Sequence, residues 1–155
     1  MAAKPHLLIV EARFYDDISD ALFEGARMAL EQAGATWERV SVPGALEIPY
    51  AIRMAVEASD EETLKRPFDG YVALGCVIRG ETAHYDIVAR ESAAGLYMLA
   101  VEHGVPIGNG ILTCETGDQA WERASVARRN KGCDAARACI TLMQLEKNFS
   151  QASRR

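Results

Sequence analysis

Short apolar runs alternate along the chain with longer segments in which apolar residues recur every three or four positions. Leu7–Val10 is wholly apolar, as is the run that begins at Val72, and both are typical of strands buried on two faces. The run Val40–Val42 alternates apolar and polar residues and predicts a less buried strand, which Pro43 ends. A fourth strand is predicted over 105–113.

The segments between these runs have the periodicity of amphipathic helices. The first helix ends at Gly34, the second carries Pro49 in its first turn, and Gly104 closes the third. Asn130–Gly132 separates a helix expected at about 118–128 from a last helix. The apolar stripe of the third helix is expected to consist of Ile87, Val88, Ala94, Gly95, Met98 and Leu99.

Strands and helices that alternate in this way predict a doubly wound, three-layer α/β/α sandwich on a four-stranded parallel, flavodoxin-like sheet. A length of 155 residues suits a single domain, 1–155. We expect residues 1–5 and 150–155 to be frayed termini. Ligands of such sheets bind at the carboxyl ends of the strands, so the chemistry is expected in the turns that follow them.

Composition narrows the classes of partner. The net charge is -5 and no lysine- or arginine-rich run is present, which argues against nucleic-acid binding. The four cysteines form no Cys-x-x-Cys pair and show no zinc-ligand spacing with the histidines, so we expect no metal site and buried, reduced thiols. No apolar run approaches the ~18 residues of a membrane span, and no signal-peptide pattern opens the chain. These features predict a cytoplasmic protein without membrane contact.

The stretch from Val72 to Asp86 changes within a few residues from an apolar strand to a polar turn and a helix N-terminus. Free backbone N–H groups at a helix start favour an anion such as phosphate. His84 follows the turn, and its side chain changes protonation easily near neutral pH. The simpler alternative is an ordinary connection between strand and helix with a solvated histidine.

Two further turns carry aromatic and acidic residues to the same edge. Phe14 and Tyr15 follow the first strand; the core is the commoner place for aromatic rings, and a platform for a flat ligand is the alternative. Gly44–Glu47 follows the second strand and offers uncovered backbone and a carboxylate, although a tight turn explains the same residues. Gly108 and Gly110, inside the fourth strand, indicate a bulge or the close approach of a ligand or another backbone.

The convergence of these turns favours a site for a flat ring and a phosphate, in either an enzyme or a binding module. Five motifs then carry a family resemblance: Arg13-Phe14, Pro43-Gly44-Ala45-Leu46-Glu47-Ile48-Pro49, the run from Gly75 to Tyr85, Gln119-Ala120-Trp121-Glu122-Arg123-Ala124, and Asn130-Lys131-Gly132. In their order and spacing they resemble the 6,7-dimethyl-8-ribityllumazine synthase family, from Leu7 to about Phe149.

The resemblance implies a transferase of riboflavin biosynthesis that needs no cofactor. It would condense 5-amino-6-(D-ribitylamino)uracil with 3,4-dihydroxy-2-butanone 4-phosphate and release phosphate and water. By carry-over from the family, His84 is the proton shuttle. The implied substrate-binding residues are Phe14 for the pyrimidine ring, Val77 and Ile78 for its edge with Cys76 beside them, Gly44, Ala45, Leu46 and Glu47 for the ribityl chain, Gly80, Glu81, Thr82 and Arg123 for phosphate, and Lys131 for the ring oxygens.

Two positions depart from the family pattern. Asn109, which would also line the site, stands where many members have an aromatic residue, and Glu81 replaces a small residue. The resemblance also implies a homo-oligomer, either a pentamer or an icosahedral shell of twelve pentamers, with each site shared between neighbouring subunits. The competing classes are a non-catalytic flavin- or lumazine-binding protein and a shell whose role is mainly structural.

Overall fold

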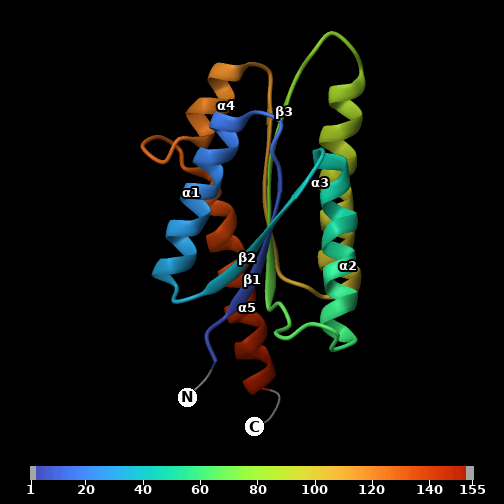
Figure 1. The fold of residues 1–155 in the computed structure, drawn as a ribbon, viewed down its shortest axis with the longest axis vertical. Helices are drawn as coiled ribbons and strands as arrows, with labels where there is room; N and C mark the ends of the chain where they lie inside the picture. The colour runs from blue at the N-terminus through green and yellow to red at the C-terminus, as the bar shows by residue number, and fades with distance from the viewer. Residues whose placement is uncertain (1–2, 153–155) are drawn as a thin grey trace.

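The computed structural model describes residues 3–152, in which strands and helices alternate. The elements are β1 (His6–Ala12), α1 (Asp16–Gln32), β2 (Thr36–Val42), the 3₁₀ turn η1 (Ala45–Glu47), α2 (Ile48–Asp60), β3 (Gly70–Ile78), α3 (His84–His103), β4 (Ile107–Cys114), α4 (Gly117–Ala124) and α5 (Lys131–Ala152). The strands form one parallel sheet in the order β2-β1-β3-β4 (Figure 1). This order confirms the predicted α/β/α sandwich with a flavodoxin-like sheet.

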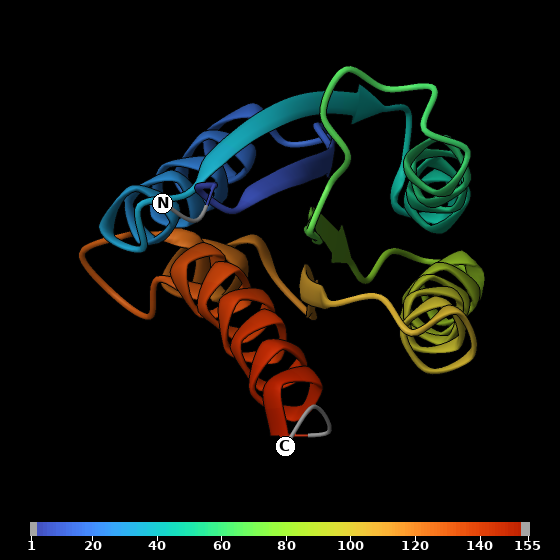
Figure 2. The same cartoon turned by 90° about the horizontal axis from the view of Figure 1, so that it is seen from below.

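Helices cover both faces of the sheet. α1, α4 and α5 lie on one face and α2 and α3 on the other, as Figures 1 and 2 show from two directions. Successive residues of β1 pack against opposite helical layers: Leu7 and Ile9 pack toward α1 and α5, whereas Leu8 and Val10 pack toward α2 and α3. A strand needs apolar residues at every position when both of its faces are covered, which explains the unbroken apolar run.

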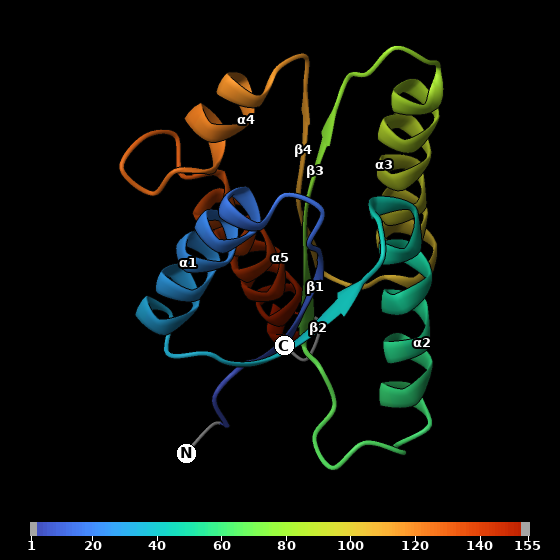
Figure 3. The same cartoon turned by 45° about the horizontal axis from the view of Figure 1, so that its top comes forward.

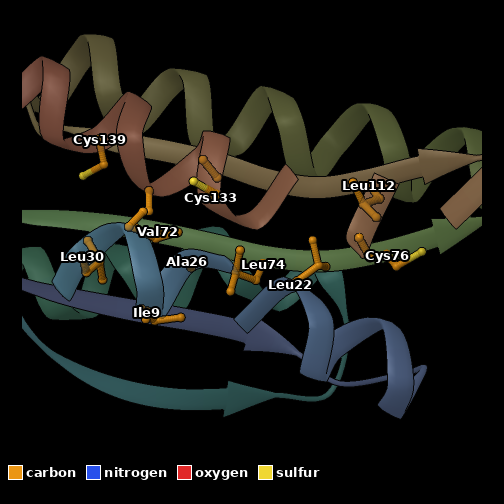
Figure 4. Packing of buried hydrophobic residues seen from close by; sticks show 14 of the residues in the cluster. Ile9, Leu22, Ala26, Leu30, Val72, Leu74, Cys76, Leu112, Cys133 and Cys139 are labelled. Carbon is orange, nitrogen blue, oxygen red and sulfur yellow. The ribbon is translucent and has the colours of Figure 1, made fainter. Parts of the chain in front are cut away.

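The larger of the two cores lies between the sheet and α1, α4 and α5 (Figure 4). Leu22, Ala26 and Leu30 of α1 meet Ile9 and Val72 of the sheet there. All four cysteines are buried and unpaired, as expected, and all belong to this cluster; Figure 4 labels Cys76 on β3 and Cys133 and Cys139 on α5. They act there as small apolar side chains.

Glycines bring α5 close to its neighbours. A Cβ on Gly108 of β4 would lie 1.9 Å from the carbonyl oxygen of Ala135, and one on Gly132 would lie 2.0 Å from the carbonyl oxygen of Leu22. The glycines within the fourth strand therefore accommodate the backbone of another element, which was one of the alternatives that the sequence left open.

Several helix ends differ from their predicted positions. α2 continues to Asp60. α4 stops at Ala124, four residues earlier than expected, because the backbone of Ser125 leaves the helical conformation, with φ -58° and ψ 128°. α5 continues to Ala152, past Ser150, where a frayed tail was expected. The outer parts of the predicted frayed termini, 1–2 and 153–155, lie outside the described residues. Within 3–152, no helix is both long and apolar enough to span a bilayer.

The buried face of α3 is also partly different from the prediction. Its buried residues are Val88, Ser92, Leu96 and Leu99, whereas Ile87 and Met98 are exposed. Ser92 interrupts the apolar stripe of this helix, so the sequence did not indicate that it is buried. Its hydroxyl donates to the Ala89 carbonyl oxygen at 3.3 Å, and this hydrogen bond satisfies the polar group inside the core.

Candidate active site

A cleft of about 350 Å³ lies where β1, β2 and β3 end. Figure 3 turns this carboxyl edge of the sheet toward the viewer. The walls come from the turn after β1, the turn after β2, the end of β3 and the first turns of α3. The lining residues are Ala12, Phe14, Tyr15, Pro43, Gly44, Ala45, Leu46, Glu47, Cys76, Val77, Ile78, His84 and Val88. The fold thus brings together the predicted residues of these segments.

Phe14 stands out among the lining residues because 73% of its surface is exposed. Its ring meets the ring of Tyr15 edge-on, with centroids 4.9 Å apart and planes at 69°. Tyr15 packs against the core, but the preference for a core position is wrong for Phe14. Phe14 lies in the turn beyond Ala12, the last paired residue of β1, so its ring extends past the sheet and offers a face to a flat ligand.

The turn after β2 adds a carboxylate, Glu47, to the lining of the same cleft. Gly44 is extended and leads into η1, and a Cβ on Gly44 would lie 3.0 Å from Oε2 of Glu47. Ala45 is buried while Leu46 and Glu47 are exposed. The carboxylate therefore folds back over Gly44, and a larger residue there would crowd it.

His84 is the first residue of α3 and is exposed at the cleft. Its backbone N–H donates to the Thr82 hydroxyl oxygen at 3.4 Å. Gly80, Glu81 and Thr82 are exposed in the turn between Ile78 and His84, which both line the cleft. Figure 1 shows this turn arching above the sheet. The start of a long helix and an imidazole thus lie at one end of the cleft, an arrangement suited to an anion and to proton transfer.

Arg79 stabilises the turn between β3 and α3 through two ion pairs, a role that was not predicted from the sequence. Its guanidinium pairs with Asp86 of α3 at 3.2 Å and with Glu115, just after β4, at 2.8 Å, and it lies 4.3 Å from the centroid of the Tyr85 ring. The hydrogen bonds to these carboxylates raise the pKa of Arg79 above its ordinary value. Glu115 lies 36 positions from Arg79 in sequence, so no local pattern could have predicted that pair, although Asp86 is only 7 positions away.

Cys76 contributes an apolar wall rather than a nucleophile. Burial raises the pKa of its thiol to about 12, and the neighbouring Cys114 adds to the rise. A thiol that stays protonated at neutral pH reacts slowly, because the thiolate is the nucleophile. Among the described residues, no three histidine, cysteine, aspartate or glutamate side chains come together as ligands for a metal ion.

The remaining predicted residues lie elsewhere. Asn109, Arg123 and Lys131 line a second cavity of about 420 Å³ along β4, which is the edge strand on the side of the sheet away from β2. Arg123 donates to the Gln119 carbonyl oxygen at 3.1 Å, and Lys131 pairs with Asp134 at 3.0 Å. Among the described residues the two cavities share no lining residue. Within one chain, the predicted site residues therefore lie in two separate groups, one in each cavity.

Other lining residues of the first cleft escaped the sequence interpretation. Ala12, Pro43 and Val88 are apolar, so nothing in their own chemistry indicated a functional site. They line the cleft because they lie beside the polar residues of the turns. Val88 follows His84 by four residues on α3, so the helical period alone could have pointed to it.

These features define an α/β/α protein of flavodoxin-like topology with a cleft at the carboxyl ends of its strands. The family model described as 6,7-dimethyl-8-ribityllumazine synthase matches residues 4–147, and the chain belongs to this family.

Curated relatives agree with this assignment. The chain is 58% identical over 147 residues to the 6,7-dimethyl-8-ribityllumazine synthase of Agrobacterium fabrum (strain C58), and the aligned residues cover 95% of this chain and 98% of that protein. It is 56% identical over 144 residues to 6,7-dimethyl-8-ribityllumazine synthase 1 of Rhizobium meliloti (strain 1021), covering 93% of each. The corresponding protein of Azorhizobium caulinodans is 56% identical over 141 residues, 91% of this chain and 86% of that protein.

Proposed function

We propose that this protein is an enzyme of riboflavin biosynthesis that works in the cytoplasm. It condenses 5-amino-6-(D-ribitylamino)uracil with 3,4-dihydroxy-2-butanone 4-phosphate and forms 6,7-dimethyl-8-ribityllumazine, phosphate and water. The observation that carries the proposal is the family match over residues 4–147, within which the cleft residues Phe14, Glu47 and His84 lie together.

The pyrimidine stacks on the exposed ring of Phe14, and the backbone of Val77 and Ile78 contacts its edge. The turn from Gly44 to Glu47 holds the ribityl chain, since it combines exposed backbone with a carboxylate that accepts hydroxyl hydrogen bonds. The ring platform and the carboxylate belong to one cleft, which supports binding of both parts of one substrate.

The phosphate of the second substrate binds at the turn Gly80–Thr82, next to the N-terminus of α3. The Glu81 side chain is exposed, which leaves it free to turn toward solvent and away from the anion. His84 then moves protons during imine formation, phosphate loss and ring closure. Positioning together with one acid/base group accelerates such steps.

Each site is completed by a neighbouring subunit of a homo-oligomer, a pentamer or a 60-subunit shell. Arg123, at the phosphate, and Lys131, at the ring oxygens, come from that neighbour together with Asn109. Their place in a second cavity on the edge strand supports this division. Large apolar side chains are exposed on two helices, which is typical of surfaces that a partner covers: Ile87, Tyr97, Met98 and Val101 on α3, and Leu142, Leu145 and Phe149 on α5.

The direct test is to incubate the purified protein with both substrates, in the presence of a chelator, and to follow the absorbance of the lumazine product. We expect product formation to depend on protein and on both substrates. Binding of the pyrimidine without turnover would instead favour the non-catalytic binding protein. Activity that a chelator abolishes and a divalent metal restores would contradict the proposed metal-free chemistry.

A further inference from the structure

Behind the cleft, on the face of the sheet that α1 covers, lies a carboxylate that the proposed chemistry does not use. Glu11, the last residue but one of β1, is only 2% exposed. Its oxygens accept hydrogen bonds from Arg39 at 2.9 and 3.3 Å, from Ser41 at 3.3 Å and from Arg13 at 3.4 Å. A carboxylate this buried depends on hydrogen-bond donors, and displacing them would leave its oxygens unsatisfied, so we expect the cluster to keep its geometry.

Arg13 extends from this cluster across the turn that carries Phe14. One nitrogen of its guanidinium donates to Glu11, and the other donates to Asp20 of α1 at 2.5 Å. The fork thus joins the end of β1 to the second turn of α1, on either side of Phe14 and Tyr15. Two charge-assisted hydrogen bonds from one planar group fix direction as well as distance.

The same cluster also includes residues of β2. Arg39 of β2 bonds to Glu11 and lies 3.6 Å from the centroid of the Phe23 ring on α1. β2 leads directly into the turn that carries Glu47. The cluster therefore connects the elements from which both the ring platform and the carboxylate side of the cleft emerge.

Neither Glu11 nor Arg13 is among the residues that line the cleft. The ring of Phe14 is largely exposed, so the conformation of its turn, rather than packing in the core, sets its direction. We propose that Arg13 is a positioning residue: by bridging Glu11 and Asp20 it holds the turn so that Phe14 is ready to stack on the pyrimidine. The inference rests on the proposed function, because it assigns Phe14 its ligand.

The test measures binding of ribitylaminouracil by calorimetry, which does not require turnover. Arg13→Gln leaves Glu11 paired with Arg39 and Ser41, and Asp20→Asn removes the negative charge at the opposite, exposed end of the bridge. The matched control is Arg27→Gln: Arg27 also lies on the α1 side of the molecule and also pairs with two carboxylates, Glu24 and Glu31, but within the helix.

We expect Arg13→Gln to weaken pyrimidine binding about 3- to 10-fold, the size expected when a side chain must be ordered during binding. Asp20→Asn should act in the same direction, and Arg27→Gln should bind like the wild type. KM for the phosphorylated ketone should not change in either bridge variant, which a general loss of structure would not achieve.

A double-mutant cycle tests whether Arg13 affects pyrimidine binding through the ring of Phe14. If Arg13 acts through the ring, Arg13→Gln should cause no further loss of binding in a Phe14→Ala background. An equal loss in both backgrounds, or wild-type binding by both bridge variants, would overturn the inference. Unchanged binding by Phe14→Ala would instead overturn the proposed ring platform, and with it the assignment of Arg13.

Discussion

The three histidines show how surroundings decide what one side chain can do. His6 is buried, with Nδ1 2.8 Å from the Thr36 hydroxyl and Nε2 2.9 Å from Glu38, and its ring stacks on Phe68. His103 is exposed in the last turn of α3. His84 is exposed at the first turn of the same helix, where it also lines the cleft. A proton shuttle must be reachable by substrate and free to change partners, and of the three His84 meets both conditions at the cleft.

Replacing His84 by alanine should lower kcat by about 10²- to 10⁴-fold, the usual contribution of a positioned acid/base group. Binding of the pyrimidine should change little, because Phe14 and the turn after β2 remain. Steady-state kinetics together with calorimetry measure the two quantities separately. His103→Ala is the matched control and should keep wild-type turnover, since it lies at the opposite end of α3. Wild-type turnover by His84→Ala would make His84 an ordinary solvated histidine.

At the scale of elements, α5 depends on glycines to reach both the sheet and α1. Gly108 lets the backbone of β4 approach Ala135, and Gly132 lets the first turn of α5 approach Leu22 of α1. This placement also sets the second cavity, because Lys131 and Asp134 of α5 line it beside β4. The same close packing therefore stabilises the fold and positions a predicted substrate-binding residue.

The substitution Gly108→Ala should destabilise the protein by about 1–3 kcal/mol, the usual cost of overpacking, because its Cβ would collide with the Ala135 carbonyl oxygen. Urea unfolding at one fixed protein concentration measures the difference, since assembly also contributes to apparent stability. Gly117→Ala is the control: a Cβ there would meet no atom within 4 Å, and stability should stay the same or rise slightly. Equal stability of both variants would contradict the close packing of β4 on α5.

At the scale of the whole molecule, the predicted site residues are divided between two cavities of the same chain. Phe14, Glu47 and His84 lie in the first cleft, whereas Arg123 and Lys131 lie in the cavity on the edge strand. A cyclic ring places one patch of each subunit against a different patch of its neighbour. Such a ring can therefore bring the two groups together at every interface, which a single chain does not do.

Mixing two inactive variants tests this arrangement. Phe14→Ala and Arg123→Ala should each lose most activity alone, but subunits unfolded and reassembled together should form some interfaces that carry neither change. Activity should then return in mixed rings, verified by native mass spectrometry. As a control, Phe14→Ala and His84→Ala alter the same cleft, so a ring of these two variants should regain activity at no interface, because each cleft keeps one defect. Mixed Phe14→Ala and Arg123→Ala rings as inactive as their parents would place the whole site in one chain.

The sequence by itself determined the order of strands and helices, the parallel sheet and the edge at which the cleft lies. These features follow from local properties: the period of apolar residues distinguishes strand from helix, and glycine or proline marks the ends of several elements. Gly34 and Gly104, for example, were expected to end helices, and both have the positive φ that glycine adopts readily. Phe14 and the turn Gly44–Glu47 were predictable in the same way, because they follow strands, whereas Ala12, Pro43 and Val88 of the same cleft were not predicted.

Contacts between distant segments were decided only by the tertiary structure. Whether Phe14 is buried depends on what covers its turn, and whether Gly108 faces a ligand or a backbone depends on where α5 lies. Glu11 and Arg39 stand 28 positions apart, so their partly buried ion pair has no local signature. The separation of the two cavities likewise depends on β4 being the edge strand. Local sequence sets which conformation a segment prefers, but burial and partners are set by the segments that pack against it.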